Sequence, residues 1–361
     1  MNSKGLNVIA GDIGGTKTTL AVFSFGIGLQ SPLAKGTFPS GNYPDLESIV
    51  REFLSQDAKG IKVNCASFGV AGPVIDGRAE ITNLPWIVDE KILAGAFGFS
   101  SVFVINDLAA CACALPFLES RDLCTLNEGI SDPAGTIAIV APGTGLGEAY
   151  LTWNKTNYQA HASEGGHSDF APTNALEAGL LNYLWKRFDH VSTEMVCSGS
   201  GLINIYNYLK DSKYAAEPGW LAAELSAVDD PVPVIIQVAV DADRSCKLCR
   251  SALGVFVHVL GAEAGNTALK LMASGGVYLG GGIPPRIIAE LRKGSFMDAF
   301  RHKGRMSELL ERMPVRVIMN PQAALLGAAR YAMELILSTE CFGTSTAARK
   351  KTLEAGYEKF S

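Results

Sequence analysis

Apolar runs that end in glycine-rich turns dominate the pattern at the start of the chain. Residues 8–10 (VIA) are apolar, the turn GDIGGT occupies residues 11–16, and residues 18–25 (TTLAVFSF) resume the apolar pattern. β-Branched and aromatic residues such as these suit strands and lose side-chain freedom in helices. The pattern therefore predicts a strand, a wide glycine turn and a second strand.

The same segment nearly matches a Walker phosphate loop, whose pattern is G-x-x-x-x-G-K-[ST]. Thr16 stands where the second glycine belongs, ahead of Lys17 and Thr18. A Walker loop also leads into a helix, whose N-terminus holds the phosphates. Because a strand is predicted after this turn, the segment is interpreted as a β-hairpin and not as a P-loop.

A related pattern occupies residues 136–153 (TIAIVAPGTGLGEAYLTW), with an apolar strand, a turn of glycines and threonine, and a second strand. The letters of the two hairpins align only loosely. Their shared architecture nevertheless suggests two similar domains that face each other.

The rest of the chain mixes strands with helices. Strands are predicted within residues 62–72 and at 101–106, 275–279 and 315–319. Helices are predicted at 107–118, 201–210 and 241–272, from Pro284 or Pro285, and from about Ser338. A further helix is predicted at 321–337, with Asn320 as its N-cap. Such alternation implies α/β layers. The glycine turns gather at strand ends, where open α/β sheets bind their ligands.

Composition places the chain among ordinary globular proteins. It has 361 residues, of which 48% are hydrophobic and 19% charged, with a formal net charge of −5. This balance argues against a nucleic-acid-binding surface. No apolar stretch reaches the length of a membrane-spanning helix, so no membrane segment is expected.

The eight cysteines follow no regular spacing and several lie in apolar runs, which is typical of reduced thiols in a cytoplasmic protein. Cys246 and Cys249 form a C-x-x-C pair. A zinc site would need further ligands nearby. The pair is therefore expected to place two small side chains on one helical face, with a metal or redox role as the alternative.

The glycine turns are candidate phosphate-binding elements, because glycine lets backbone N–H groups approach polyphosphate closely and a hydroxyl adds a directed donor. One turn offers Gly14, Gly15 and Thr16, and a second offers Gly143, Thr144 and Gly145. A third, Gly280 to Gly282, would leave space for the adenosine of a nucleotide. Each turn alone also fits an ordinary hairpin.

Two residues beside the first turn have two interpretations each. Asp12 ends the first strand and could hold Mg²⁺, directly or through water, or could cap the turn through backbone hydrogen bonds. Lys17 could meet a phosphate or could be a solvated strand residue.

Asp107 is the candidate catalytic residue. It follows the apolar strand VFVIN and begins a helix, so its carboxylate would lie at a strand end, where it could accept the proton of an attacking hydroxyl. The alternative is that Asn106 or Asp107 only caps the helix.

Polar residues also gather in the segment HASEGGHSDFAPTN, which holds Glu164, His167 and Asp169. The adjacent Gly165 and Gly166 make a helix improbable here, which disfavours a metal site built on E-x-x-H spacing. Carboxylates and an imidazole suit the vicinal hydroxyls of a sugar. Glu194 could add a further polar contact or be an exposed glutamate at a helix end.

Six segments in this order carry a family resemblance: GDIGGTKT, INDLAA, APGTGLGEAYL, EGGHSDFAP, SGSGL and LGGGIPPR. From about Asn7 to Met333 the chain resembles the bacterial-type glucokinase family, part of the sugar kinase, Hsp70 and actin superfamily. The IND and EGGH segments are the most specific, since the phosphate turns are shared across the superfamily.

The resemblance implies a role for each candidate residue. Asp107 would deprotonate the sugar 6-hydroxyl. The residues implied to contact glucose are Asn106, Glu164, His167 and Glu194, with Asn83 on a loop near the sugar. Those implied to contact ATP are Asp12, Gly14, Gly15, Thr16, Gly143, Thr144, Gly145, Gly280, Gly281 and Gly282.

The resemblance further implies an α/β fold, the two-domain actin-like ATPase (ribonuclease H-like) fold with an interdomain cleft. The small domain would comprise residues 1–115, completed by a C-terminal helix at about 338–361, and the large domain residues 116–337. The implied activity is the phosphorylation of D-glucose by ATP and Mg²⁺, the first step of glycolysis, in a cytoplasmic homodimer with no nucleic-acid or membrane partner.

Three alternatives stay open at this point. The chain could be a kinase for another hexose or an amino sugar, or could use ADP or polyphosphate as donor. It could also be a nucleotide-switched chaperone or filament protein of the same superfamily, which would need no polar sugar loop.

Overall fold

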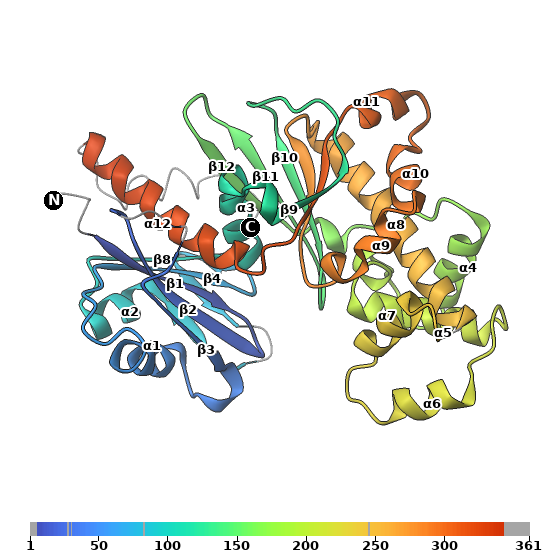
Figure 1. Cartoon of the computed structure of the whole chain (residues 1–361), viewed down its shortest axis with the longest axis horizontal. Helices are drawn as coiled ribbons and strands as arrows, with labels where there is room; N and C mark the ends of the chain where they lie inside the picture. Colours follow the sequence, from blue (N-terminus) through green and yellow to red (C-terminus); the bar gives the residue numbers. More distant parts are fainter. Residues whose placement is uncertain (1–5, 27–28, 30, 82–83, 245, 343–361) are drawn as a thin grey trace. The chain divides into compact units, whose positions relative to one another are not determined.

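The structure is a computed structural model that describes residues 6–342 apart from residues 27, 28, 30, 82, 83 and 245 (Figure 1). The chain divides into two compact units: Met1–Leu118, Thr156–Ala162 and Asn320–Ser361 form the first, and Glu119–Lys155 and Ser163–Met319 the second. Asn83 and any helix beyond residue 342 lie outside the described residues.

The first unit contains a five-stranded sheet of order β3-β2-β1-β4-β8. Its strands are β1 (Asn7–Ile13), β2 (Lys17–Ser24), β3 (Ala34–Pro39), β4 (Cys65–Val70) and β8 (Ser101–Asn106). Strands β1 and β2 pair antiparallel, which confirms the hairpin predicted from the sequence and excludes a P-loop. Strands β1, β4 and β8 run parallel, so their carboxyl ends share one edge of the sheet.

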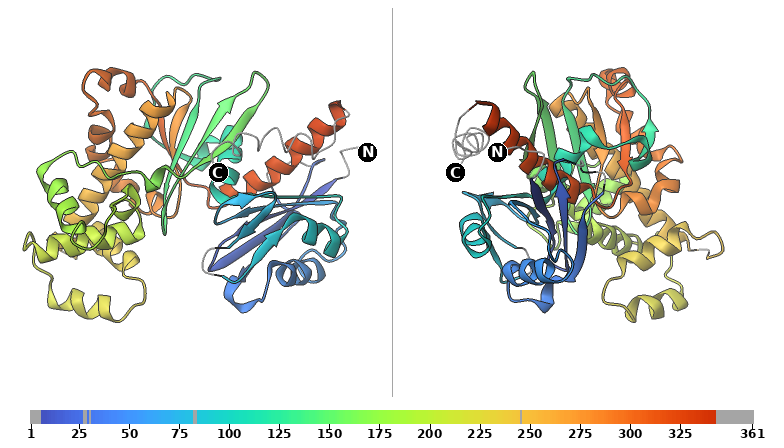
Figure 2. Two further views of the ribbon diagram at one scale, coloured as in Figure 1. Left: turned by 180° about the vertical axis from the view of Figure 1, so that it is seen from behind. Right: turned by 60° about the vertical axis from the view of Figure 1, so that its left-hand side comes forward.

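Both faces of this sheet are covered by helices (Figure 2). Alternate residues of β1 enter two different cores: Ile9 packs with helix α1 (Leu46–Ser55) and helix α2 (Glu90–Phe97), whereas Val8 packs with helix α12 (Ala323–Phe342). Side chains alternate across a strand, so a strand covered on both sides must be apolar throughout. This explains why β1, β2 and β4 are buried along nearly their whole length and are mostly apolar.

The remaining elements of the first unit are short. They are the three-stranded sheet β5 (Val74–Ile75), β6 (Arg78–Glu80) and β7 (Ile87–Asp89), helix α3 (Asp107–Ala114), and the 3₁₀ turns η2 (Ser40–Asn42) and η3 (Leu115–Phe117). Side-chain caps set the helix starts, because Asp45 accepts a hydrogen bond from a first-turn amide of α1 and Asp89 does so for α2.

A six-stranded sheet of order β12-β11-β10-β13-β14-β9 organises the second unit. Its strands are β9 (Leu123–Asn127), β10 (Ile137–Pro142), β11 (Leu146–Trp153), β13 (Gly276–Leu279) and β14 (Val315–Ile318), with β12 (Tyr158–Ser163) at the edge. The division of the chain counts β12 up to Ala162 with the first unit, although the strand pairs within this sheet. The antiparallel pair β10–β11 confirms the second predicted hairpin. Strands β10, β13 and β14 run parallel, as β1, β4 and β8 do in the first unit.

Helices and 3₁₀ turns make up the rest of the second unit. The helices are α4 (Ala175–Leu184), α5 (Gly199–Asp211), α6 (Gly219–Ser226), α7 (Val232–Val240), α8 (Lys247–Leu271), α9 (Ile288–Leu291), α10 (Ser295–Arg301) and α11 (Ser307–Glu311); the turns are η4 (Ser120–Asp122), η5 (Gly165–His167), η6 (Thr193–Met195), η7 (Pro284–Ile287) and η8 (Gly304–Met306).

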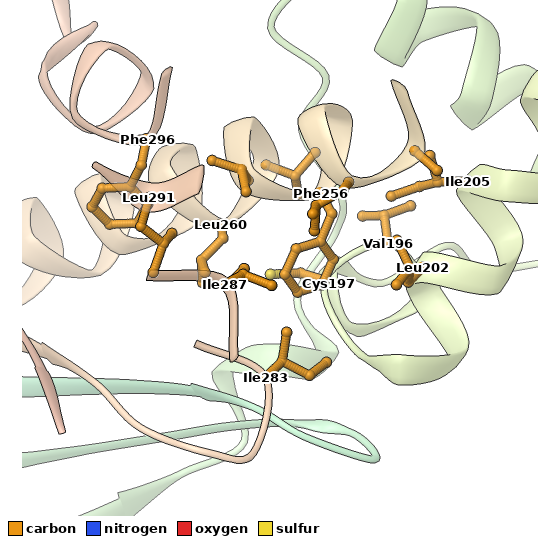
Figure 3. Packing of buried hydrophobic residues seen from close by; sticks show 14 of the residues in the cluster. Val196, Cys197, Leu202, Ile205, Phe256, Leu260, Ile283, Ile287, Leu291 and Phe296 are labelled. Carbon is orange, nitrogen blue, oxygen red and sulfur yellow. The ribbon is translucent and has the colours of Figure 1, made fainter. Parts of the chain in front are cut away.

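Helix α8 is the centre of the second core. Figure 3 shows Phe256 and Leu260 of α8 among apolar side chains from α5, η7 and α9, including Leu202, Ile287 and Leu291. In length and hydropathy α8 could cross a membrane, yet 72% of its most apolar window is buried inside the protein, as in a core helix.

Three predicted boundaries differ from the structure. The helix predicted from residue 241 begins at Lys247, because α7 runs to Val240 and Asp241 turns the chain by accepting a hydrogen bond from the Asp243 amide. The last described helix begins at Ala323 rather than at Pro321, and Asn320 accepts its hydrogen bond from the Gln322 amide. Pro284 and Pro285 begin a 3₁₀ turn ahead of α9.

The C-terminal part of the first unit starts at Asn320, not near residue 338 as expected. The reason is that α12 is one continuous helix to Phe342, and its buried residues Leu325, Ala328 and Ala329 share a core with β1.

The C-x-x-C pair has a structural role at the start of α8. The Cys246 sulfur accepts a hydrogen bond from the Cys249 amide at 3.4 Å, so Cys246 is the N-cap of α8. The prediction that both cysteines lie on one face of the helix is therefore wrong for Cys246. Both side chains are buried, and the seven cysteines with described side chains are free thiols. Among the described residues no three His, Cys, Asp or Glu side chains are grouped as metal ligands.

We expect Gly327→Ala to destabilise the first unit. A Cβ at Gly327 of α12 would overlap the Ala110 carbonyl of α3, and overpacking of this kind costs about 1–3 kcal/mol. Thermal unfolding should therefore move to lower temperature. The control is Gly95→Ala in α2, where nothing lies within 4 Å and alanine should stabilise the helix by about 0.5–1 kcal/mol. Equal effects of the two substitutions would contradict this packing.

Candidate active site

The first glycine turn joins β1 to β2 and is held by a buried serine. The Gly14 amide donates to the Lys17 carbonyl at 3.0 Å. Ser40 donates its hydroxyl to the Gly14 carbonyl at 2.8 Å, and its amide donates to the Thr16 carbonyl at 3.0 Å. The amides of Gly15 and Thr16 have no hydrogen-bond partner within the described chain, so both are available to an anion.

Sequence reasoning missed Ser40. Its hydroxyl also pairs with the Thr18 hydroxyl at 3.0 Å, and both side chains are fully buried. Ser40 follows β3 on the far side of the hairpin, and no local pattern connects it with the turn. Only the antiparallel pairing of β2 with β3 brings it there.

Asp12 and Asp107 lie at the carboxyl edge of the first sheet. Asp12 pairs in register with Gly69, and the α-carbon of Asp107 lies 3.5 Å from where a Cβ of Gly69 would be. Burial raises the pKa of the Asp12 carboxyl, while the Lys17 charge opposes the shift. No hydrogen bond to the Asp12 carboxylate occurs in the described part of the chain, so the turn-capping alternative is not observed.

The helix-capping alternative applies to Asn106 and not to Asp107. The Asn106 side-chain oxygen accepts from the amides of Leu108 and Ala109 at 3.0 and 3.1 Å, and its amide donates to the Gly72 carbonyl at 3.2 Å. Asp107 occupies the first helical position, and its carboxylate oxygen Oδ1 accepts the Leu108 amide at 2.8 Å. The carboxylate therefore keeps further acceptor positions.

Burial raises the pKa of Asp107 to about 6, and the neighbouring Asp12 charge adds to this shift against the Leu108 hydrogen bond. A carboxyl with this pKa is largely ionised near neutral pH, yet it is a stronger base than an exposed aspartate. Two neighbouring carboxylates out of water also favour a bound cation.

In the second unit the two other glycine turns lie side by side. A Cβ on Gly143 would lie 4.0 Å from the Gly282 nitrogen, and one on Gly281 would overlap the Pro142 carbonyl. Gly281 has a φ of +79°, which glycine adopts without strain. The amides of Thr144 and Gly145 donate no hydrogen bond to any described residue. These turns can therefore present backbone donors together.

The predicted polar residues of the second unit also come together. His167 lies 3.9 Å from Glu164 and 4.0 Å from Glu194, measured between nitrogen and carboxylate oxygen. Glu194 accepts the Leu146 amide at 2.8 Å, and a Cβ on Gly145 would overlap its carboxylate. Glu194 thus links this cluster to the second phosphate turn and is not an exposed helix-end glutamate.

Two details of the EGGH segment differ from the prediction. Residues 165–167 form a 3₁₀ turn rather than an open loop, and this turn brings Glu164 close to His167. Asp169 lies apart from the cluster, because its exposed carboxylate pairs with His190 at 2.9 Å.

Known proteins that resemble this chain identify its family. A family model described as Glucokinase matches residues 9–335. A curated glucokinase from Nostoc punctiforme is 39% identical over 342 residues, covering 91% of this chain and 99% of the relative. The chain belongs to the glucokinase family. It is accordingly an enzyme of the kinase class.

Solved glucokinases have the same fold. The crystal structure of a glucokinase from an Antarctic psychrotroph is 32% identical, with a TM-score of 0.77 and coverage of 91% of this chain and 99% of that one. A ROK family glucokinase from Streptomyces griseus, solved with glucose and AMPPNP, has a TM-score of 0.61 at 21% identity, with 91% and 99% covered. The glucokinase-family chain described here therefore has the two-domain actin-like ATPase fold, in agreement with the matching sheet orders of its units.

We expect Ser40→Ala to loosen the first phosphate turn. The Thr18 hydroxyl and the Gly14 carbonyl would lose their partner, and an unsatisfied buried polar group costs about 1–3 kcal/mol. Thermal unfolding should occur at lower temperature, and hydrogen exchange of residues 14–17 should accelerate. Ser55→Ala, which removes an exposed hydrogen bond at the end of α1, is the control and should change neither. Unchanged exchange in Ser40→Ala would exclude this role.

Proposed function

We propose that the protein transfers the γ-phosphoryl group of Mg²⁺-ATP to the 6-hydroxyl of D-glucose, the first step of glycolysis. The observation that carries the proposal is the Asp107 carboxylate, which lies at the end of β8 with spare acceptor positions and a pKa of about 6. Family membership supports the reaction class, and the polar cluster of the second unit supports a sugar as acceptor.

Asp107 acts as the general base. As the glucose 6-oxygen forms a bond to the γ-phosphorus, its proton passes to the Asp107 carboxylate, and the bond between the γ-phosphorus and the β,γ-bridging oxygen breaks to release ADP. The Leu108 amide fixes one carboxylate oxygen and leaves the other to face the sugar. Asn106 holds the start of α3, which positions Asp107.

Glu164, His167 and Glu194 hold the sugar hydroxyls, and Asn106 and Asn83 contribute from the first unit. The carboxylates accept hydrogen bonds from vicinal hydroxyls, and the imidazole either donates or accepts. At 3.9 and 4.0 Å the His167 nitrogens are too far from the two carboxylates for a direct hydrogen bond, so these polar atoms remain available to a sugar.

Backbone amides bind the nucleotide. Gly14, Gly15 and Thr16 lie against the phosphates on one side and Gly143, Thr144 and Gly145 on the other. The donors are the amides of Gly15, Thr16, Thr144 and Gly145, because those of Gly14 and Gly143 already donate to the Lys17 and Gly145 carbonyls. Gly280, Gly281 and Gly282 line the adenosine pocket. The Asp12 carboxylate, which no described hydrogen bond occupies, would hold Mg²⁺ directly or through water. Bound there, Mg²⁺ would supply positive charge against the phosphates.

We further propose a cytoplasmic homodimer without nucleic-acid or membrane partners. The free thiols support a reducing compartment, and the negative formal charge supports the absence of a nucleic-acid partner. The family resemblance supports the dimer.

A coupled assay of ADP release against a hexose panel tests the proposal. We expect release with ATP and glucose, and Asp107→Asn should reduce kcat about 10²–10⁴-fold because no base accepts the proton. The Kd for glucose should stay near that of the parent. The parent's kcat should fall as pH drops through about 6, where Asp107 takes up a proton. The exposed Asp229→Asn is the control.

The outcomes separate the alternatives. Release with another sugar alone, or with ADP or polyphosphate alone, would reassign acceptor or donor. Nucleotide hydrolysis that no sugar stimulates would point to a nucleotide-switched protein. Full activity of Asp107→Asn would end the base assignment.

Glu164→Gln and His167→Asn should each raise the KM for glucose about 10- to 100-fold, because hydrogen bonds that involve charged groups contribute about 1.5–3 kcal/mol. The KM for ATP should change little. Asp169→Asn is the matched control, since Asp169 lies in the same segment but pairs with His190. If the KM values for glucose and ATP rose equally, the sugar-binding assignment would be wrong.

A further inference from the structure

Two glutamates are buried beneath the EGGH segment and have no part in the reaction described above. Glu148 belongs to β11 and Glu263 to α8, and their exposed fractions are 6% and 5%. A buried carboxylate is costly unless hydrogen bonds or an opposite charge compensate it. The surroundings of this pair supply only part of that compensation.

The hydrogen bonds are unequally distributed. The Glu263 carboxylate accepts hydrogen bonds from the side-chain amide of Asn266 at 3.0 Å and from the Thr267 hydroxyl at 3.5 Å. The Glu148 oxygen Oε1 is fully buried and meets the geometric criteria for a hydrogen bond with none of the described residues. An orphaned buried oxygen of this kind calls for a proton or a ligand.

The charged and titratable groups that face the two glutamates come from three parts of the chain. Lys270 of α8 lies 3.9 Å from Glu263, but its side chain is 62% exposed. Lys303, which follows α10, binds the Asn266 side chain at 2.6 Å, and burial lowers its pKa while the Glu263 charge raises it. From the segment between η6 and α5 comes the Cys197 thiol, whose pKa is raised by burial and then by both carboxylates.

One proton shared by Glu148 and Glu263 would compensate for the missing hydrogen bond and for the repulsion between the two carboxylates. Burial raises the pKa of Glu148 to about 7, the Glu263 charge adds to the shift, and Lys270 opposes it. In the singly protonated pair the hydroxyl of one carboxyl can donate to the other, so that only one negative charge remains buried. In the doubly ionised pair two like charges repel in a dry site.

The pair directly supports the sugar-binding segment. Gly165 lies so close to Glu148 that a Cβ there would overlap the carboxylate oxygen Oε2. The Gly165 amide is held by the Ser163 hydroxyl at 3.0 Å. Glu164 precedes this glycine and His167 closes the same 3₁₀ turn, so the Glu148 carboxylate lies against the turn that carries both side chains.

We propose that Glu148 and Glu263 form a proton-sharing carboxyl pair that holds the turn at residues 165–167 in position, so that the protein binds sugar more tightly when the pair carries one proton than when it carries none. The pair consists of positioning residues, and the inference rests on the proposed sugar-binding role of Glu164 and His167. Since sugar and proton binding are linked, glucose should also promote proton uptake.

The experiment is isothermal titration of the full chain with glucose, without nucleotide, between roughly pH 6 and 8.5. The parent's Kd should rise about fivefold over this range, the lower end of the usual coupling between linked sites. Glu148→Gln, which keeps the shape of the protonated side chain, should bind with a Kd near the parent's low-pH value throughout. The exposed Glu128→Gln is the matched control and should retain the parent's slope.

Glu263→Gln provides the same test from the other partner, should Glu148→Gln not fold. A slope that persists in both variants would overturn the inference, because it would come from a group outside the pair. A flat profile in the parent would overturn it as well. Both results would leave the proposed function intact, whereas failure to bind glucose at any pH would remove the proposed function and this inference with it.

Discussion

The site in the first unit depends on keeping two carboxylates, Asp12 and Asp107, together at the carboxyl ends of three parallel strands. Parallel pairing of β1, β4 and β8 directs the carboxyl ends of these strands to the same side. Burial raises the pKa of both carboxyl groups, and the Asp12 charge raises that of Asp107 further, which yields a base suited to neutral pH and a place that favours a cation. The glycine turn, the Asn106 cap and the Ser40 hydroxyl all keep the backbone around these two groups in place.

Local patterns were enough to predict much of this arrangement. The two hairpins followed from β-branched and aromatic runs around glycine turns, and the strand-to-helix transition at Asn106 and Asp107 followed from an apolar run that ends at a capping residue. Such features depend on neighbours in the sequence, so a single chain reveals them. The same holds for the EGGH segment, where polar residues are concentrated.

Features that depend on distant neighbours could not be predicted in this way. Ser40 reaches the Gly14 turn only because β2 pairs with β3, and Glu148 meets Glu263 only because α8 packs against the sheet that contains β11. Glycines next to bulky or charged groups conceal such contacts as well: the letters EGGH reveal nothing of a buried carboxylate under Gly165. The observed starts of α8 and α12 differ from the predicted ones, because side-chain caps and short turns, rather than the hydrophobic period, determine where a helix begins.

The course of the chain through the first unit has a consequence for its biosynthesis. Residues of β1 and β2 that face α12, such as Val8, Ala21 and Phe23, emerge from the ribosome early, but the helix that covers them is translated only after the entire second unit. At elongation rates of about 5–20 residues per second, this face waits on the order of ten seconds or more for its cover. The nascent chain therefore carries an apolar surface through most of translation, which makes it a natural client for ribosome-associated chaperones.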